Sequence, residues 1–549
     1  MSELFDKLNN YLTKNKIDGL YFNSSNEFLM EYNVLELNSA FKLTGFSGST
    51  SMGVALKDKV YLFVDTRYHA QADIEVKEDF IETVKVPMEK YLYEVMFEVL
   101  GDNFVLGVPA KKISKYLFDV FKKQGKSKKI KFKPLKDDGI EVCDSSFIPE
   151  KYFNIYEVPI EISGKSADDK ISDLIKKYDN SSLIITDLSD IAYFLNLRSF
   201  DFPYSSSFPS KLIINDKGAV LYVNSEQKFN SKLIRTKFFD EYYNDLKCIK
   251  NSNVLYQKKS ISLYDFNLID KSNKISDADF SQKQYKNKFE IEHLKYCFNM
   301  TDRALEIIEQ MLNSDSLYSE FDYSKALVDS LYSNGVCGLS FKPIVACGEN
   351  SAIIHYGTPS KDKIVKDGDF LLIDYGAYFE GGYATDTTRT FIKGKPSNKQ
   401  KSVYTTVLKA FLNAYHKPSK KYFDIDQKAR KVIDKELNGE YPFSHGTGHG
   451  VGINVHEAPI TLSSHKLSKT EIRENTVFSI EPGAYKLGFG GVRLENTVYA
   501  NKLNDIIMPE TLSKYKFEDK LVDRKLLTKQ ELKWYLDWQD EYARTYLAK

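Results

Sequence analysis

The segment IDYGAYFEGGYATDTTRTF, residues 373–391, decides how the carboxy-terminal part of this 549-residue chain folds. Apolar and polar residues alternate on both sides of a glycine-containing turn, which is the pattern of a β-hairpin. If the turn is centred on Glu380, Asp374 lies directly opposite Asp386, with their β-carbons roughly 4.5–5.5 Å apart. Two carboxylates at that distance repel each other unless a cation lies between them. The hairpin therefore predicts a metal site, and the alternative is an exposed hairpin with two solvated aspartates.

Three histidines follow in the glycine-rich segment SHGTGHGVGINVHEAP, residues 444–459. The segment contains His445, His449 and His456, and the whole chain has only eight histidines. Its four glycines exclude a stable helix, and they allow the backbone to approach a ligand closely. A lone histidine is more often structural than a ligand, but a cluster beside glycines favours a functional site.

Two glutamates complete the candidate site in VFSIEPGAYKLGFGGVRLENTVY, residues 477–499, which is predicted as strand, glycine-rich loop and strand. Glu481 precedes a proline that ends strand pairing, which suits a residue at a strand end facing a site. Glu495 lies on the returning strand, and Arg493 lies on the same face two residues earlier. Each glutamate alone would be a solvated strand residue. Together with the two aspartates and His449, they give the four carboxylates and one imidazole that two divalent ions sharing a water require.

The composition is that of an ordinary globular protein, with 42% hydrophobic and 28% charged residues. The 77 basic and 76 acidic residues nearly cancel, so no net field favours nucleic acid or an anionic membrane. Five cysteines without a C-x-x-C pair argue against a disulfide framework and fit a reducing compartment. The charged amino-terminal segment is no secretory signal, and no apolar run reaches the roughly 18 residues of a membrane span. These features predict a cytoplasmic protein.

The amino-terminal half contains two segments with the same pattern. Residues 2–15 are predicted as an amphipathic helix, and residues 51–65 as a hairpin with a charged turn. Residues 166–178 are predicted as a helix capped by a serine, and residues 211–224 as a second hairpin. Corresponding segments lie about 160 residues apart, which indicates two similar α/β domains in series.

A polar stretch near 270–290 marks the next boundary. We therefore expect an amino-terminal α/β domain over 1–157, a middle α/β domain over 158–282, and a catalytic domain over 283–549 with a helical tail. Trp534 and Trp538 lie four residues apart in this tail, so they face one side of a helix, packed either on its own domain or on a second subunit.

Several motifs resemble one family over nearly the whole chain. LLIDYGA, TDTTRTF, HGTGHGVG, VHE, SIEPG and GVRLEN are similar to the metal-site blocks of the pita-bread metallopeptidases, and specifically of the three-domain aminopeptidase P (Xaa-Pro aminopeptidase) family. NEFLMEYN, FSGSTS and DTRYHAQA resemble its amino-terminal domain, LSDIAYFLNLRSFDFPYSSSF its middle domain, and LLTKQELKWYLDWQDEY its tail. The resemblance implies two similar α/β domains followed by a pita-bread catalytic domain, a mixture of α/β and α+β architecture. One departure is an extra residue in the FEGGY turn between the two aspartates, and another is the compact spacing from His449 to His456.

The resemblance also implies a role for each candidate residue. Asp386 and Glu495 would bridge two divalent ions, Asp374 would chelate one of them, and His449 and Glu481 the other. Glu481 would take or relay a proton. Four residues would line the substrate site: His355 from SAIIHYGTP, His445, His456 and Arg493. The three histidines among them would also assist catalysis.

The implied activity is release of the amino-terminal residue from peptides with proline at the second position, through hydroxide formed from the water that the two ions share. The oxygen-rich ligand set suits manganese, although zinc, cobalt or iron could bind. The family also implies a homodimer. A prolidase-type Xaa-Pro dipeptidase is the nearest alternative, and a non-catalytic pita-bread peptide-binding protein is a further one. Methionine aminopeptidase is disfavoured by the two preceding domains, and a metal-free creatinase-like hydrolase by the complete ligand set.

Overall fold

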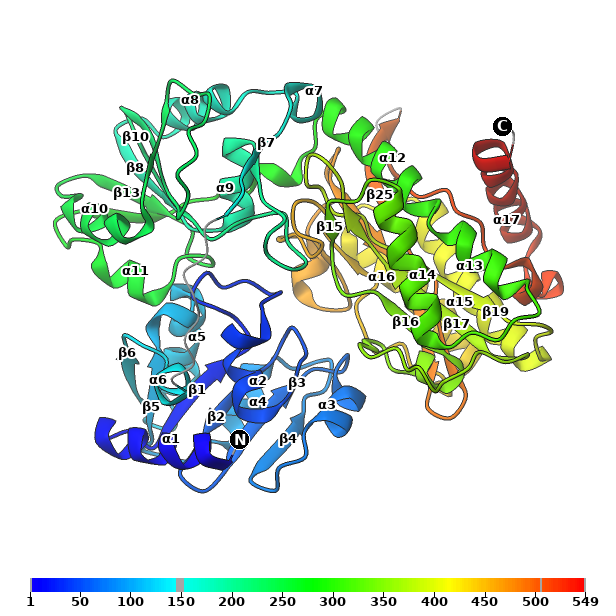
Figure 1. The fold of residues 1–549 in the computed structure, drawn as a ribbon, viewed down its shortest axis with the longest axis horizontal. Helices are drawn as coiled ribbons and strands as arrows, with labels where there is room; N and C mark the ends of the chain where they lie inside the picture. The colour runs from blue at the N-terminus through cyan, green and yellow to red at the C-terminus, as the bar shows by residue number, and fades with distance from the viewer. Residues whose placement is uncertain (1, 145–152, 504–505, 548–549) are drawn as a thin grey trace. The chain divides into compact units, whose positions relative to one another are not determined.

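The computed structural model describes residues 2–144, 153–503 and 506–547. The chain divides into two compact units (Figure 1). Most of the first unit comes before most of the second in the sequence. The first unit comprises Met1–Val158, Lys165–Pro203 and Ser207–Phe280; the second comprises Pro159–Gly164, Tyr204–Ser206 and Ser281–Lys549. The expected boundaries near residues 157 and 282 stay predictions. None of the described helices has both the length and the apolar content needed to cross a bilayer.

The first unit contains two six-stranded sheets with the same strand order and the same directions. The first sheet has the order β4-β3-β2-β1-β5-β6, and the second has the order β12-β11-β10-β8-β13-β14. In each, two antiparallel pairings at the centre are flanked by parallel pairings. This identity of topology agrees with the predicted duplication.

The bounds of the first sheet and its helices follow the predicted pattern, and the hairpin expected over 51–65 is β2–β3. The strands are β1 Gly19–Asn23, β2 Met52–Ala55, β3 Val60–Val64, β4 Ile81–Lys85, β5 Val105–Pro109 and β6 Lys131–Leu135. The helices are α1 Ser2–Asn15, α2 Ser39–Thr44, α3 His69–Glu75, α4 Leu92–Val99, α5 Lys115–Gln124 and α6 Gly139–Asp144.

The second sheet contains the other predicted hairpin as β10–β11. Its strands are β8 Ser181–Ile185, β10 Lys211–Asn215, β11 Gly218–Tyr222, β12 Ile234–Lys237, β13 Asn253–Tyr256 and β14 Lys274–Asp277. Its helices are α8 Ala167–Lys177, α9 Leu188–Leu195, α10 Tyr242–Cys248 and α11 Leu263–Leu268. Two short strands, β7 Tyr156–Glu157 and β9 Leu197–Arg198, pair with each other in a separate antiparallel sheet. Ser166 caps α8 as predicted, because its hydroxyl accepts the backbone N–H of Asp169 at 3.1 Å.

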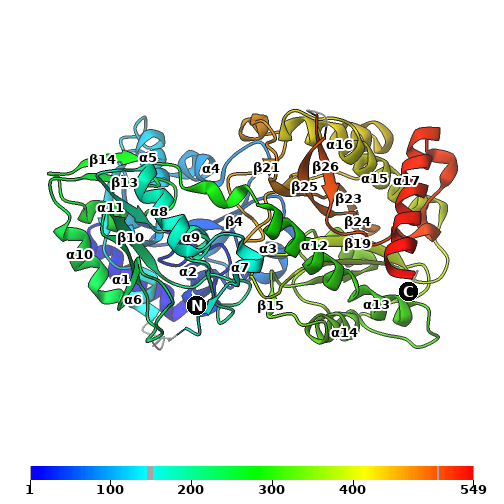
Figure 2. The same cartoon turned by 90° about the horizontal axis from the view of Figure 1, so that it is seen from above.

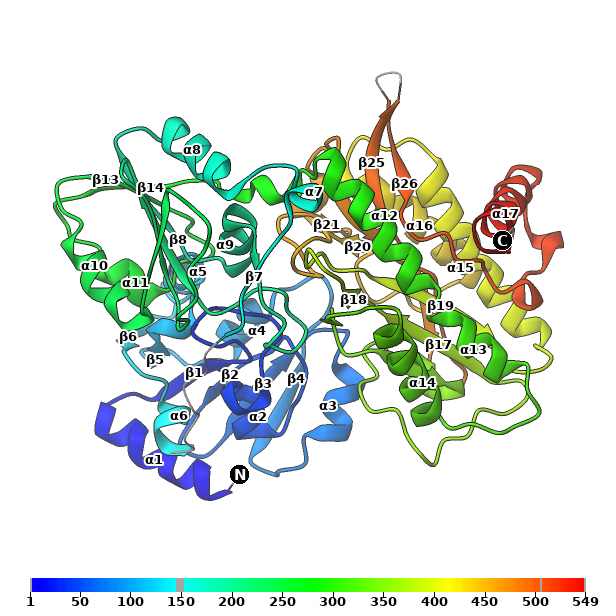
Figure 3. The ribbon, with the colours of Figure 1, turned by 45° about the horizontal axis from the view of Figure 1, so that its top comes forward.

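The second unit has two half-sheets, each covered by its own helices (Figures 2 and 3). The strands of the first half are β16 Ile344–Cys347, β17 Phe370–Tyr375 and β19 Thr387–Ile392. They pack on α13 Leu305–Leu312 and α14 Glu320–Ser333, through a cluster that includes Leu327, Leu331, Val345 and Ile373. α12 Lys288–Asp302 precedes α13 as a separate helix.

The second half-sheet consists of β22 Val477–Ile480, β25 Asn496–Leu503 and β26 Ile506–Thr511. It packs on α15 Asn398–His416 and α16 Tyr422–Leu437, which lie side by side in Figure 2. Short pairs complete the unit: β15 Gly338–Leu339 with β18 Ala377–Tyr378, β20 Gly448–His449 with β21 Thr461–Leu462, and β23 Gly483–Lys486 with β24 Gly490–Arg493. α7 Ile160–Ser163 also belongs to this unit.

The aspartate hairpin forms, but its predicted register is wrong by two residues. Asp374 pairs with Thr388, not with Asp386. The reason is the turn, which runs through Gly381 and Gly382 at φ of 91° and 64° instead of centring on Glu380. Strand side chains alternate with a period of two, so a shift of two residues keeps both aspartates on the same face of the hairpin. They therefore form a diagonal pair instead of facing each other directly.

The carboxy-terminal helix α17, Lys529–Tyr542, packs on its own unit. Trp538 is buried against Phe411 of α15, with ring centroids 5.6 Å apart. Trp534 stacks on His416 at the end of α15, with centroids 4.6 Å apart and planes 8° from parallel. Of the two alternatives for this tail, packing within the unit is thus observed for both tryptophans.

Candidate metal centre

The five predicted ligands all lie at strand ends of the second unit. Asp374 is near the end of β17, and Asp386 immediately precedes β19. His449 ends β20, Glu481 follows β22, and Glu495 precedes β25. Pro482 separates β22 from β23, as predicted from its lack of a backbone donor. Strand ends place short, well-held side chains at the junction of the two half-sheets.

Three of these residues form a close group. One ligand atom each from Asp386, His449 and Glu495 lies within 4.8 Å of the others. Nε2 of His449 is 3.5 Å from Oδ2 of Asp386, and it is 3.3 Å from Oε1 of Glu481, which joins Glu481 to the group. Asp374 interacts with the group through its charge, which contributes to raising the pKa of Asp386 and of Glu495.

Two carboxylate oxygens of the cluster lack any hydrogen-bond donor among the described residues. They are Oδ1 of Asp374 and Oε1 of Glu495, both fully shielded from solvent. The other oxygen of each carboxylate is engaged: Thr388 Oγ1 donates to Glu495 Oε2 at 2.7 Å, and Arg493 Nη2 donates to Asp374 Oδ2 at 2.6 Å. A buried acceptor without a partner costs roughly 1–3 kcal/mol, and more if it is charged. Hard divalent cations bind such oxygens, so the donor set fits a metal centre.

The electrostatics of the cluster agree with this assignment. Burial, and then the charges of neighbouring carboxylates, raise the pKa of Asp386 and of Glu495 well above the ordinary values. Burial also raises the pKa of Asp374, although Arg493 opposes the shift. Burial would raise the pKa of Glu481 too, but the hydrogen bond with His449 and the nearby cationic groups outweigh it and lower that pKa to about 2. Bound cations would stabilise the ionised form of every one of these groups.

His449 is oriented for ligation by its own backbone. Its Nδ1 lies 3.1 Å from the carbonyl oxygen of Gly450 and donates an N–H to it, and its Nε2 faces the carboxylates. The ring of His456 packs against it edge to face, with centroids 4.3 Å apart and planes at 83°. Of the three histidines in the predicted cluster, His449 and His456 are therefore in direct contact.

His445 begins a second chain of polar contacts. Its Nε2 lies 2.7 Å from the hydroxyl of Tyr485, which accepts from Arg493 Nη1 at 2.9 Å. The Tyr485 hydroxyl therefore donates to Nε2, and Nδ1 of His445 donates to the Gly446 carbonyl at 2.8 Å. Burial lowers the pKa of His445 to about 4, so this imidazole is neutral at pH 7. Arg493 thus connects this series of polar contacts to Asp374.

Tyr485 is a site residue that sequence reasoning missed. It lies on β23, four residues after Glu481, and its hydroxyl contacts both His445 and Arg493. The signal that could have revealed it is strand periodicity, because residues an even number of positions from Glu481 share its face. Burial raises the pKa of Tyr485 to about 12 despite the opposing charge of Arg493, so the phenol keeps its proton.

The histidine loop is held in place by close backbone contacts and a buried ion pair. A Cβ atom on Gly448 would lie 2.0 Å from the carbonyl oxygen of Ser479, so only glycine fits between β20 and β22. Glu457, next to His456, pairs with Lys286, and both are at most 3% exposed. Its other oxygen accepts the backbone N–H of Ile453 at 2.9 Å. These contacts explain the glycines and the VHE sequence in structural terms.

His355 lies on the segment that follows β16. The carbonyl of its neighbour Ile354 accepts a hydrogen bond from Arg493 Nη1 at 3.4 Å. Arg493 is therefore the element that connects the His355 segment with Asp374.

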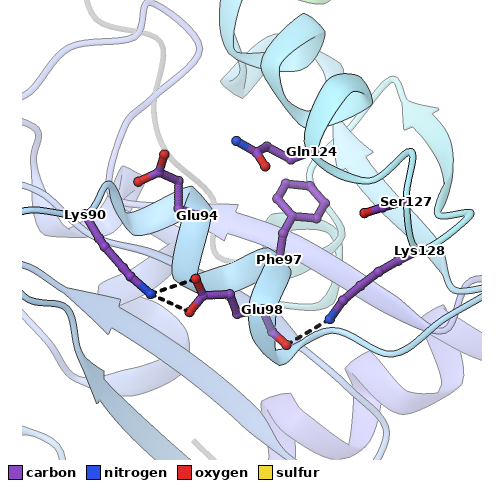
Figure 4. A pocket seen from close by; sticks show the side chains of 7 residues that line it. All are labelled: Lys90, Glu94, Phe97, Glu98, Gln124, Ser127 and Lys128. Carbon is purple, nitrogen blue, oxygen red and sulfur yellow. Dashed lines mark hydrogen bonds and ion pairs between the residues drawn. The ribbon is translucent and has the colours of Figure 1, made fainter.

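A hollow in the first unit is lined by side chains that are already paired. It has a volume of about 400 Å³ and lies between α4 and α5 (Figure 4). Its lysines are already engaged: Lys90 pairs with Glu98 at 2.7 Å, and Lys128 donates to the backbone carbonyls of Glu98 and Leu100 at 2.8 and 2.6 Å. These groups form an ordinary solvated surface.

Comparison with known families agrees with the geometry. Residues 292–502 match metallopeptidase family M24, and residues 149–290 match the creatinase/prolidase amino-terminal domain. The M24 match covers most of the second unit. The resemblance and the fold class expected from the motifs, α/β domains before a pita-bread domain, are thereby confirmed. The individual metal ligands stay predictions.

Similar proteins extend along the whole chain. A probable Xaa-Pro aminopeptidase P of Paracoccidioides brasiliensis is 28% identical, over 91% of this chain and 88% of that protein. Xaa-Pro aminopeptidase 1 of Dictyostelium discoideum is 27% identical, over 100% of this chain and 93% of that protein. Among solved structures, a cytosolic X-prolyl aminopeptidase with a dinuclear active site from Caenorhabditis elegans has a TM-score of 0.90 at 21% identity, covering 99% of this chain and 95% of that chain. A prolidase from Pyrococcus horikoshii matches 64% of this chain and 99% of that chain, with a TM-score of 0.52 and 26% identity.

Proposed function

We propose that this protein is a metal-dependent Xaa-Pro aminopeptidase, which releases the amino-terminal residue from peptides with proline at the second position. The observation that carries the proposal is the buried cluster in which acidic side chains with unpartnered oxygens meet His449 Nε2. The relatives that match over nearly their full length are named Xaa-Pro aminopeptidases, which supports this activity over that of a shorter prolidase.

Two divalent ions would be held by the five predicted ligands. These ligands would be Asp374, Asp386, His449, Glu481 and Glu495. Such ions supply Lewis acidity and make water nucleophilic at neutral pH. Manganese suits this oxygen-rich set, and zinc or cobalt are the other candidates.

The chain's own residues would handle the proton and orient the substrate. We assign Glu481 the role of taking or relaying a proton. Its carboxylate is ionised at neutral pH, because the hydrogen bond with His449 and the nearby cationic groups lower its pKa to about 2. His445 is neutral, and the Tyr485 hydroxyl holds its tautomer. We place His355 and His456 as donors to the developing oxyanion or to the carbonyl downstream of it. Arg493 is 2% exposed, so we assign it a positioning role on Asp374 and Tyr485.

A bond to proline demands recognition of an unusual kind. The tertiary amide carries no N–H, so the substrate cannot be gripped there by strand-like pairing. The enzyme must instead hold the free amino terminus and the scissile carbonyl. We propose that the amino terminus lies near Asp374, which would explain cleavage of a single residue from the end of the peptide.

Cleavage of synthetic peptides tests the proposal. The protein should release the first residue from Xaa-Pro-Pro and Xaa-Pro-Yaa-Yaa peptides after addition of Mn²⁺, and a chelator should abolish the activity. Asp386→Asn should remove it as well, whereas Lys325→Met, which changes an exposed ion pair, is the matched control. Hydrolysis confined to Xaa-Pro dipeptides would favour prolidase. A protein without stoichiometric metal and without hydrolysis would favour a peptide-binding role.

Location and assembly belong to the same proposal. We expect a cytoplasmic homodimer, because the cysteines fit a reducing compartment and the family resemblance implies a dimer. Both tail tryptophans pack within one unit, so the subunit contact would use other residues. Light scattering of the purified protein would give its mass in solution.

A further inference from the structure

We propose that Glu320 is a positioning residue that fixes the segment 347–363, and through it His355. This inference rests on the proposed function, since His355 is a predicted substrate residue. Glu320 is the first residue of α14, it is fully buried, and it lies in neither glycine-rich motif. The juxtaposition that carries the proposal is one carboxylate that accepts hydrogen bonds from both ends of the same loop.

The ends of the loop meet at the amino terminus of α14. Oε1 of Glu320 accepts the backbone N–H of Cys347 at 2.7 Å, where the chain leaves β16. Oε2 accepts the backbone N–H of Ser360 at 3.0 Å, where the chain returns. The backbone N–H of Glu320 itself donates to the carbonyl of Lys363 at 3.0 Å. The carboxylate therefore closes the neck of a compact loop, and His355 lies near the middle of it.

Two side chains inside the loop bind the same carboxylate. Asn350 Nδ2 donates to Oε1 at 2.9 Å, and the Tyr356 hydroxyl donates to Oε2 at 2.8 Å. Burial, and then the bond to Glu320, raise the pKa of Tyr356, so its phenol keeps the proton that it donates. Tyr356 is the neighbour of His355 in the sequence. The loop is thus tied to Glu320 at both ends and beside the histidine.

The chemistry of these contacts requires a carboxylate. Each oxygen of Glu320 faces one backbone N–H, at Cys347 and Ser360, and a backbone donor cannot be turned around. Glutamine has the same shape, but one of its two positions is an NH₂ group. Whichever way the amide is oriented, this group would oppose an N–H donor, so the neck would open on one side.

The far side of the loop contacts the metal centre. Ser351 Oγ accepts the backbone N–H of Gly491 on β24 at 2.7 Å. The Ile354 carbonyl accepts from Arg493, which binds Asp374. Movement at the neck would therefore displace His355, while the predicted ligands beside β19, on β20 and beside β22 are held by other strands.

Glu320→Gln tests the proposal, with Glu531→Gln as the matched control. Glu531 is also a buried carboxylate at a helix amino terminus, where it accepts from Asn413 Nδ2 at 2.7 Å and from the backbone and hydroxyl of Thr528 at 2.9 Å. It belongs to α17. We expect Glu320→Gln to lower kcat/KM roughly tenfold to a hundredfold, as misplacement of a substrate residue does, with bound metal unchanged. Glu531→Gln should leave kcat/KM within about threefold of the wild type, the range of an ordinary remote change.

A double-mutant cycle separates positioning from general damage. If Glu320 acts through His355, Glu320→Gln should change kcat/KM by less than about threefold in a His355→Ala background. Hydrogen exchange gives a readout without catalysis: amides of residues 348–360 should exchange faster in Glu320→Gln and not in Glu531→Gln. Multiplicative losses in the cycle, or unchanged exchange in the loop, would overturn the proposal. An inactive wild-type protein whose loop still depends on Glu320 in exchange would count against the proposed function alone.

Discussion

Replacement of Thr388 by valine probes the hydrogen bond that orients Glu495. Thr388 is fully buried, its hydroxyl donates to Oε2 of Glu495 at 2.7 Å, and it accepts from Arg493 Nε at 3.2 Å. Valine keeps the shape of threonine and removes the hydroxyl. The Glu495 carboxylate then loses the bond at Oε2 that fixes the direction of its free oxygen, Oε1.

The magnitude follows from the type of bond. A hydrogen bond to a charged acceptor contributes about 1.5–3 kcal/mol, and roughly 1.4 kcal/mol corresponds to a tenfold change in an equilibrium constant. We therefore expect Thr388→Val to weaken binding of Mn²⁺ about tenfold to a hundredfold. Isothermal titration of the metal-free protein, or competition with a chelator of known affinity, measures the change.

Thr497→Val is the matched control. Thr497 is equally buried, but its hydroxyl donates at 2.9 Å to the backbone carbonyl of Asp386, a neutral acceptor. A bond between neutral groups contributes about 0.5–1.5 kcal/mol, so this variant should bind the metal nearly as the wild type does. If both variants bind Mn²⁺ equally well, the reasoning that Thr388 orients a metal-ligating carboxylate is refuted.

Three further substitutions test the pH response and the packing around the site. Burial lowers the pKa of His416 to about 4, so the unfolded chain binds this proton more readily, and stability should fall as the pH drops from about 6.5 toward 4. Urea unfolding should show a loss of about 1–2 kcal/mol after allowance for solvent screening, absent in His416→Phe. Gly448→Ala should lower the melting temperature and metal content together, because its Cβ would meet a backbone oxygen at 2.0 Å, whereas Gly101→Ala, with nothing within 4 Å, should do neither. Lys286→Met leaves its carboxylate partner buried and unpaired, so it should destabilise the fold by about 3–5 kcal/mol in denaturant titration. An equal effect of Lys325→Met, at an exposed pair, would contradict that reasoning.

Local patterns predicted the elements well, because they depend on neighbours in the sequence. The helix expected over 2–15 is α1, and the two hairpins formed where charged turns interrupt alternating strands. The serine cap of α8 is a contact over three residues, which is equally visible in the sequence. The glycines of the histidine loop were expected to admit a ligand, whereas Gly448 is required for the close approach of β20 to β22.

The register of the aspartate hairpin could not be predicted, because it depends on where the chain turns. Both Gly381 and Gly382 adopt positive φ, and the sequence FEGGY permits more than one centre for the turn. The conclusion that Asp374 and Asp386 share a face survived, since strand parity is insensitive to a shift of two residues. The predicted close spacing of the two aspartates was wrong, because it assumed that they lie directly opposite each other.

Contacts between distant segments were beyond the sequence altogether. Lys286 and Glu457 lie 171 residues apart and form a buried pair, and nothing near either residue indicates the other. Glu320 closes a loop that ends 40 residues later. Tyr485 could be placed on the face of Glu481, but its two partners come from different elements. Such contacts appear only when the half-sheets and helices are packed together.

The central claim is that the five predicted ligands gather two divalent ions. An anomalous-scattering map of crystals grown with Mn²⁺, recorded at the manganese edge, tests it most directly. The account predicts two peaks between Asp386 and Glu495, one on the side of Asp374 and the other on the side of His449 and Glu481. Peaks elsewhere, with this cluster of carboxylates left without a metal at saturating Mn²⁺, would contradict it.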